Sequence, residues 1–276
     1  MIMKNLVLHN DVAIPQIGLG SWQAMPGGEA YDAVATALRA GYRHIDTAAI
    51  YGNEEDVGQA IRDSGIPRGD IFVTTKLWNT DHGYGRAKQA FLDSLQRLGL
   101  DYIDLYLIHF PFGGRICETW KAMEELYGEG RVRAIGVSNF TTEHLDYLMR
   151  GAAITPMVDQ VEYHPYLSQD PLQRYCDEHR IVIEAWSPLG SGRFVEDTNV
   201  RAIAVKHHRS IPQIILRWDI QRGVVTLPKS VHQQYIEENL DILDFRLDAT
   251  DMASLNALNR DWHTGTNPEL IPIDQE

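Results

Sequence analysis

Residues 71–109 read IFVTTKLWNTDHGYGRAKQAFLDSLQRLGLDYIDLYLIH, and this stretch decides the fold. The apolar, β-branched runs at residues 71–76 and 103–109 have the length and composition of buried strands. Between them, residues 84–98 place apolar side chains at helical spacing. Two strands joined by a helix predict a parallel pair, because a parallel connection requires a crossover, which is usually a helix.

The same alternation extends along the chain in both directions. Further strands are expected at residues 14–20, 44–46, 134–138, 157–162, 181–186 and 224–228. Helices are expected at residues 30–40, 54–64, 117–129, 142–149, 171–178, 212–221 and 235–240, with two extra ones at 199–208 and 251–258. Eight β/α units predict an α/β fold, a (β/α)8 TIM barrel in one domain over residues 1–276, because such barrels commonly take about 250 residues. We also expect an N-terminal β-hairpin.

A doubly wound parallel sheet is the competing fold. Its nucleotide-binding version requires Gly-x-Gly-x-x-Gly directly after the first strand, at the start of a helix. Residues 18–23 read GLGSWQ, which lacks the third glycine, and several residues separate it from the next helical pattern. The barrel is therefore favoured.

Composition limits the classes of partner. Apolar residues make up 44% of the chain and the net charge is −13, with acidic and basic residues interspersed. This pattern disfavours a nucleic-acid surface, which needs clustered Lys and Arg, but is compatible with a cationic pocket for one phosphorylated cofactor. No apolar stretch reaches the roughly 20 residues of a membrane helix. The N-terminal residues lack a signal-peptide core, so we expect a cytoplasmic monomer with two reduced thiols, Cys117 and Cys176.

Four ionisable side chains fall at three successive strand ends. Asp46, Lys76 and His109 end the second, third and fourth expected strands, and Tyr51 lies in the loop after the second. Each alone has an ordinary structural explanation, as a cap, a solvated charge or a core side chain. The C-terminal strand ends of a barrel, however, form its functional face, so we predict that the four converge.

The four residues suit proton delivery to a carbonyl oxygen. A tyrosine titrates near 10, and a nearby ammonium lowers that value. Lys76 is expected to do so for Tyr51, with Asp46 offsetting the burial of the ammonium. His109 would orient the carbonyl. Because no side chain donates hydride, a cofactor must supply it.

Six runs resemble the aldo-keto reductase family, in the family's order. They are GYRHIDTAAIYGNE at 41–54, TKLW at 75–78, LIH at 107–109, GVSNF at 136–140, QVEYHP at 160–165 and LPKS at 227–230. The resemblance covers nearly the whole chain and is closest to bacterial members such as diketogluconate reductases. It implies reduction of aldehydes or ketones to alcohols, with hydride from NADPH, Tyr51 as general acid, Lys76 and Asp46 in support and His109 orienting the carbonyl.

The resemblance also implies a cofactor site. Ser138, Asn139 and Gln160 would hold the nicotinamide carboxamide, with Trp186 against the ring face. The turn SPLGSG at 187–192 would wrap the pyrophosphate. The complete expected set is Ser138, Asn139, Gln160, Trp186, Ser187, Leu189, Gly190, Ser191, Lys229, Ser230, Val231, Tyr235, Glu238 and Asn239.

One position departs from the family pattern. Six residues after Lys229, NADPH-preferring members usually carry an arginine, and here the residue is Tyr235. A tyrosine can stack on adenine but cannot make charge-assisted contacts to phosphate. We therefore expect NADPH to be used through Lys229 and Ser230, with weaker discrimination against NADH.

The substrate site is less well defined by the sequence. Trp22, Trp78 and Phe110 follow the first, third and fourth strands and are expected to wall an open pocket for a small carbonyl. Adjacent His207 and His208 point to different helix faces, so no metal site is predicted. Two alternatives remain open. One is a barrel hydrolase, which would need clustered metal ligands or an activated nucleophile, and the sequence shows neither. The other is a cofactor-sensing interaction subunit with little turnover.

Overall fold

The described part of the chain begins with a two-stranded hairpin that lies across one end of the barrel. The computed structural model describes residues 5–112 and 114–273. Strands β1 (Asn5–Val7) and β2 (Ala13–Pro15) pair antiparallel. Just after β1, the side chains of His9 and Asn10 bond to the carbonyl oxygens of Thr155 and Arg133, at the N-terminal side of the barrel strands. The hairpin therefore covers the end opposite to the strands' carboxyl ends.

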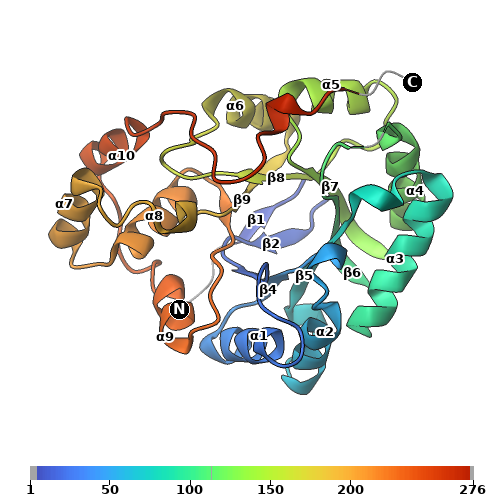
Figure 1. Cartoon of the computed structure of the whole chain (residues 1–276), viewed down its shortest axis with the longest axis horizontal. Helices are drawn as coiled ribbons and strands as arrows, with labels where there is room; N and C mark the ends of the chain where they lie inside the picture. Colours follow the sequence, from blue (N-terminus) through green and yellow to red (C-terminus); the bar gives the residue numbers. More distant parts are fainter. Residues whose placement is uncertain (1–4, 113, 274–276) are drawn as a thin grey trace.

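Eight parallel strands form the barrel in sequence order. Two isolated bridges, Ile17 to Thr226 and Gly20 to Lys229, join the first strand to the last and close the ring. Figure 1 shows the ring with helices around it. The strands are β3 (Leu19–Gly20), β4 (His44–Asp46), β5 (Phe72–Leu77), β6 (Ile103–Ile108), β7 (Val132–Ser138), β8 (Val158–Glu162), β9 (Val182–Trp186) and β10 (Val225–Thr226). The predicted (β/α)8 barrel with an N-terminal hairpin is confirmed.

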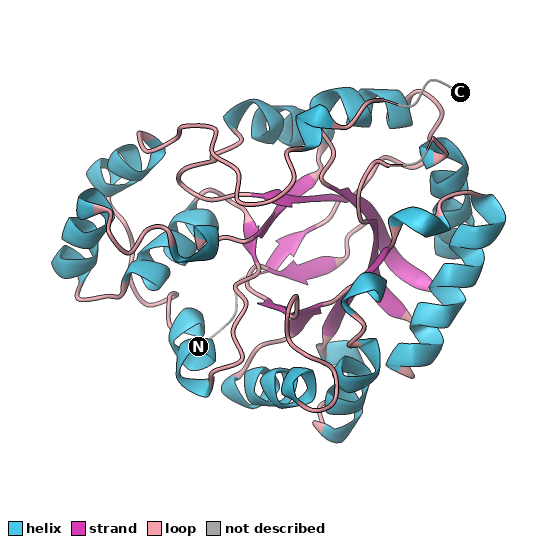
Figure 2. Cartoon of the chain, viewed as in Figure 1, coloured by secondary structure: helices cyan, strands magenta, loops and turns pink. Residues whose placement is uncertain are grey.

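The helices lie outside the ring, as Figure 2 shows. Helices α3, α4, α6 and α8 pack on the strands, whereas α9 packs mainly on α1 and α8. Strands β5 and β6 are buried throughout because the barrel interior and the helices cover both of their faces. Helices α7 and α10 are the two extra ones. The bounds are α1 (Glu29–Ala40), α2 (Glu54–Asp63), α3 (Tyr84–Leu98), α4 (Ile116–Gly128), α5 (Thr142–Met149), α6 (Asp170–His179), α7 (Thr198–His207), α8 (Ile211–Gln221), α9 (Gln233–Leu240) and α10 (Ala249–Asn256).

The predicted first strand, residues 14–20, is wrong as one element. Its start belongs to β2 of the hairpin, and its end, Leu19–Gly20, forms β3 of the barrel. Between the two, the side chain of Gln16 donates to the carbonyl oxygens of Ile220 and Val224 and turns the chain from the hairpin to the ring. At position 18 a Cβ would be 2.7 Å from the side chain of Leu227, so glycine permits this close approach.

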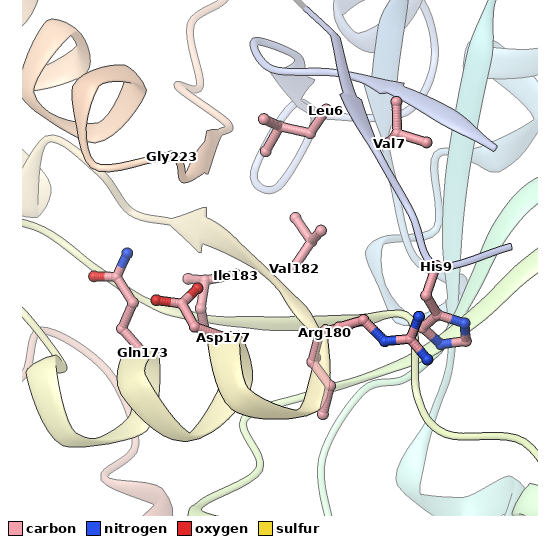
Figure 3. A pocket seen from close by; sticks show the side chains of 10 residues that line it. Leu6, Val7, His9, Gln173, Asp177, Arg180, Val182, Ile183 and Gly223 are labelled. Carbon is pink, nitrogen blue, oxygen red and sulfur yellow. The ribbon is translucent and has the colours of Figure 1, made fainter. Parts of the chain in front are cut away.

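A pocket of about 310 Å³ lies between the hairpin and the start of β9. Figure 3 shows Leu6 and Val7 of the hairpin on one side and Val182, Ile183 and Arg180 on the other. These residues lie at the N-terminal end of the barrel, away from the predicted catalytic side chains. In the described part of the chain, no helix is long and apolar enough to cross a membrane.

Candidate active site

The carboxyl ends of β4 and β5 bring Asp46 and Lys76 together. The Lys76 ammonium donates to both carboxylate oxygens of Asp46, at 2.7 and 2.8 Å, and to the carbonyl oxygen of Thr47 at 2.8 Å. Both side chains are buried. Burial alone lowers the pKa of Lys76, but the charge and hydrogen bonds of Asp46, together with the nearby Tyr51 and Glu184, outweigh burial and raise that pKa, so Lys76 is a charged group inside the protein.

Tyr51 and His109 lie beside this ion pair. Tyr51 ends a short 3-10 helix, η1 (Ala49–Tyr51), and its ring centroid is 5.2 Å from the Lys76 nitrogen. The ring of His109, which follows β6, meets the Tyr51 ring edge-on at a centroid distance of 5.7 Å. The structure thus brings together all four side chains that the strand ends predicted.

The pKa of Tyr51 corrects one step of the sequence argument. Burial raises the pKa of Tyr51, and the charge and hydrogen bond of Lys76 lower it by less. The expected net lowering is therefore wrong, because the burial of the phenol outweighs the effect of the Lys76 charge. The hydroxyl keeps its proton at neutral pH, which is the form that a general acid requires.

His109 is a neutral imidazole in a cluster of aromatic rings. Burial, with the nearby charge of Lys76, holds the pKa of His109 well below its usual range. Among the described residues, nothing bonds to its Nδ1 atom. Trp78 meets His109 edge-on at 5.1 Å between centroids, and Phe110 stacks on it at 5.5 Å. Trp22, by contrast, is 54% exposed and makes no ring contact with this cluster in the described structure.

The ends of β7, β8 and β9 place four further predicted residues next to the ion pair. Gln160 donates from Nε2 to Asp46 at 2.8 Å. Asn139 donates to Ser138 and to the carbonyl oxygen of His109, and its Oδ1 accepts the indole N–H of Trp186 at 2.8 Å. Ser138 and Asn139 are thus already paired with their neighbours. Asn139 also has a φ of 62°, a left-handed conformation in which Asn is several-fold enriched.

The loop after β9 has an unusual backbone. Ser187, Gly190 and Ser191 have positive φ values of 50°, 51° and 52°. For serine this conformation is strained, and such strain tends to occur at ligand sites. Leu189 is half-buried in the same loop.

The remaining predicted residues lie after β10 and on α9. Lys229 and Tyr235 are exposed, Tyr235 by 53%, while Ser230 and Asn239 are buried. The Ser230 hydroxyl accepts the backbone N–H of His232 at 3.1 Å, which shapes the turn into α9. Val231 and Glu238 are half-buried. These side chains form a rim separate from the buried catalytic set.

Comparison with known proteins agrees with this geometry. Residues 16–260 match the model of the aldo/keto reductase family. The chain belongs to the aldo/keto reductase family. It is therefore an oxidoreductase, and the family resemblance of its six sequence runs is confirmed, although the diketogluconate reductase subgroup is not.

Named relatives and solved structures cover nearly all of this aldo/keto reductase. It is 51% identical over 264 residues to glyoxal reductase of Bacillus subtilis, covering 96% of each chain. It is 50% identical over 267 residues to a 9,11-endoperoxide prostaglandin H2 reductase of Trypanosoma cruzi, covering 96% of this chain and 94% of the relative. A crystal structure of MGS-M4, an aldo-keto reductase from a deep-sea metagenome library, matches with a TM-score of 0.94 and 49% identity, covering 97% and 99% of the two chains.

Sequence reasoning missed a carboxylate that holds the C-terminal segment of this aldo/keto reductase. Glu162, at the end of β8, accepts the backbone N–H groups of Thr264 at 2.7 Å and Gly265 at 3.3 Å. His164 bonds to the same carboxylate at 3.1 Å. Gly265 packs so closely on the indole of Trp186 that a Cβ would be 2.7 Å from it. Glu162 therefore sets the position of the segment that backs Trp186.

A second carboxylate missed by the sequence analysis is Glu184, which is fully buried in the middle of β9. A signal was present: the run IVIEAW at 181–186 places one acid in an otherwise apolar strand. An acid at such a position requires a hydrogen-bond partner inside the protein. Its partner is Gln160, which donates to it at 2.7 Å.

Proposed function

We propose that the protein reduces small aldehydes and ketones to alcohols, with hydride from a reduced nicotinamide cofactor and Tyr51 as general acid. Residues 1–276 would act as one domain. One observation supports this above all: a buried Asp46–Lys76 ion pair lies beside a protonated Tyr51 and a neutral His109 at the carboxyl ends of adjacent strands. This set provides a proton and a means of orienting a carbonyl, without a nucleophile for hydrolysis.

The side chains have separate parts in the proposal. A carbonyl oxygen that receives an electron pair becomes an alkoxide, which is a stronger base than phenolate, so Tyr51 can protonate it despite its raised pKa. Lys76 stabilises the resulting phenolate by its charge, and Asp46 keeps Lys76 charged. His109 is neutral and can donate a hydrogen bond to the carbonyl, which fixes the angle of the reacting carbon.

The residues at the strand ends fit a nicotinamide carboxamide. Both N–H bonds of the Gln160 amide are directed to carboxyl groups, so its oxygen is available to accept a carboxamide N–H. When bound, the cofactor supplies the hydride. Together with Gln160, the side chains of Ser138, Asn139 and Trp186 would form the binding site for the nicotinamide ring, which we call the nicotinamide seat. The loop after β9 supplies the curved backbone for a pyrophosphate, at Ser187, Leu189, Gly190 and Ser191.

The other end of the cofactor distinguishes NADPH from NADH. Lys229, Ser230 and Val231 would bind the ribose phosphate, while Tyr235 stacks on adenine and Glu238 and Asn239 contact its edge. Lys229 is exposed, so its charge is free to meet a phosphate. Without an arginine at position 235, we propose that NADPH is preferred but NADH is accepted.

The aromatic rings beside His109 define the substrate class. Trp78 and Phe110 form a rigid apolar wall next to the proton donor, with Trp22 at the open side. Such a wall suits small carbonyl compounds that present a reactive C=O to Tyr51. The 51% identity to a protein named glyoxal reductase favours small aldehydes, with glyoxal as the first to test.

The test is steady-state NADPH oxidation with small aldehydes and ketones, comparing the wild type with Tyr51→Phe. We expect turnover by the wild type and a fall of at least about a hundredfold in the variant, the usual contribution of a general acid. Cofactor binding, measured by quenching of tryptophan fluorescence, should be unchanged. Binding without turnover of any carbonyl by the wild type would instead support a cofactor-sensing subunit. Loss of binding in a folded Tyr51→Phe variant would contradict its role.

A further inference from the structure

Beneath the catalytic ion pair, the barrel interior contains a second acid that the reaction does not require. Glu184 lies on β9 in register with Gln160 on β8 and is fully buried. The Gln160 Nε2 atom donates to Glu184 at 2.7 Å and to Asp46 at 2.8 Å. One amide thus bridges two carboxyl groups, one of which holds the catalytic lysine.

The scarcity of hydrogen-bond donors around Glu184 favours a neutral acid. The Nδ1 atom of His44 faces the carbonyl oxygen of Pro15 at 3.3 Å and must carry a proton, because a carbonyl can only accept. Burial lowers the pKa of His44 to about 3, so the ring is neutral and its Nε2 is an acceptor. That Nε2 lies 3.5 Å from Oε1 of Glu184. The hydroxyl of Thr74 bonds to the same Nε2 at 3.1 Å, and among the described residues Oε1 of Glu184 has no hydrogen-bond donor. A buried carboxyl group with one donor on Oε2 and none on Oε1 favours the protonated form, because the protein does not replace the water that a carboxylate would lose.

The electrostatic surroundings of Glu184 also favour its neutral form. Burial and the charge of Asp46 raise the pKa of Glu184 to about 8, against the opposing effects of Gln160 and Lys76. The titratable groups that face it are His44 and Asp46 on β4 and Lys76 on β5, and its register neighbour on β10 is Val225. Burial also raises the pKa of Asp46, but the Lys76 ammonium donates to both of its oxygens and favours its ionised form. His44 stays neutral and Lys76 stays charged near neutral pH, so Glu184, to which no cation donates, is the member of this group that we expect to change its charge there.

Gln160 connects this acid to the proposed nicotinamide seat. Because both its N–H bonds are taken by carboxyl groups, the amide cannot turn over without placing its oxygen against Asp46. Its oxygen accepts no hydrogen bond from the described residues. The two carboxyl groups therefore fix which end of the amide faces the strand ends.

We propose that Glu184 is a positioning residue that, through Gln160, fixes the nicotinamide seat and makes it sensitive to the redox state of the cofactor. The inference rests on the proposed function. With Glu184 neutral, the group of Asp46, Lys76 and Glu184 has no net charge. Loss of the Glu184 proton adds one negative charge, which attracts the cationic ring of NADP⁺ but not the neutral ring of NADPH.

The test compares the dissociation constants of NADP⁺ and NADPH at pH 6.5 and pH 9 by quenching of tryptophan fluorescence. In the ratio of the two dissociation constants, the contribution of the phosphates cancels, because both forms of the cofactor carry them. In the wild type, NADP⁺ should gain about three- to tenfold over NADPH as the pH rises. In Glu184→Gln, which resembles the neutral acid in shape, the ratio should stay at its low-pH value. Asp219→Asn is the matched control, because Asp219 is also a buried acid but bonds to Thr226 on the helix side of β10.

Each outcome of this test either supports or contradicts the inference about Glu184. A shift in the wild type and in Asp219→Asn, absent from Glu184→Gln, supports the inference. A ratio that does not change in the wild type overturns it, even if the variant fails to fold, and so does an equal shift in the wild type and Glu184→Gln. Failure of both cofactor forms to bind at either pH would instead contradict the proposed function itself.

Discussion

Removing the ammonium from the barrel interior should destabilise the fold in a pH-dependent way. In Lys76→Met, the Asp46 carboxylate loses the partner that contacts both its oxygens and remains buried. Breaking one side of a buried pair costs about 3–5 kcal/mol. Asp46 can reduce this cost by taking up a proton, because the neutral acid is cheaper to bury than the carboxylate. The pKa of this carboxyl group in the unfolded chain is about 3.9, and each pH unit above that value costs about 1.4 kcal/mol of stability if the acid stays protonated in the folded protein.

The expected loss therefore depends on pH. A variant that keeps Asp46 protonated in the folded state binds one more proton than the unfolded chain, so its stability falls as pH rises above about 4. We expect a loss of about 4 kcal/mol at pH 7 and about 1–2 kcal/mol at pH 5. Urea unfolding followed by circular dichroism at both pH values measures it.

Two further variants isolate the cause. The double variant Asp46→Asn with Lys76→Met leaves no buried charge in the pair and should lose most of the pH dependence. Lys88→Met removes an ammonium that pairs with Glu125 and Glu129 on the surface, and should change stability by less than about 1 kcal/mol at either pH. The reasoning is refuted if Lys76→Met loses the same free energy at pH 5 and pH 7.

Three other changes test particular contacts. The pKa of Glu184 is about 8 in the folded protein, so its contribution to stability is lost as pH rises from about 4 to 8. Between pH 5 and 8 the wild type should lose about 4 kcal/mol of unfolding free energy that Glu184→Gln keeps. Equal dependence of the unfolding free energy on pH in the two proteins, measured by urea unfolding, would count against this. Gly265→Ala places a Cβ 2.7 Å from the Trp186 indole and should shift tryptophan emission and reduce stability by about 1–3 kcal/mol, whereas Gly151→Ala, which meets nothing within 4 Å, should do neither. Tyr235→Arg should raise the ratio of kcat/KM for NADPH over NADH about ten- to thirtyfold, while Gln234→Arg, on the exposed neighbouring residue, should leave it nearly unchanged.

The sequence predicted the barrel because its signal is local. Each strand and helix has its own periodicity, and the rule that parallel strands end on one face brought Asp46, Lys76 and His109 together without coordinates. The hairpin boundary was harder, since residues 14–20 are apolar throughout. Only the long-range bonds of Gln16 show where the chain leaves the hairpin.

Features that depend on burial depth or on distant contacts could not be predicted in this way. The direction of the Tyr51 pKa follows from a balance between desolvation and the Lys76 charge, and only coordinates give both. Glu162 holds a segment 102 residues further along the chain, beyond the reach of any local pattern. Glu184 could have been singled out as an acid in an apolar strand, but its partners His44 and Gln160 come from other strands.

The way the ring closes has a consequence for how the chain is made. Gly18 and Gly20 do not form a nucleotide-binding fingerprint; their backbone N–H groups instead donate to the carbonyl oxygens of Thr226 and Pro228 at the last strand. Gln16 bonds to a residue 204 positions later. During synthesis, the seven earlier strands of the ring can assemble before β10 emerges from the ribosome. Until then the growing sheet has two unpaired edges, at β3 and β9, and open edges invite pairing with other chains. The short final strand therefore completes the ring and also covers the two strand edges that would otherwise be open.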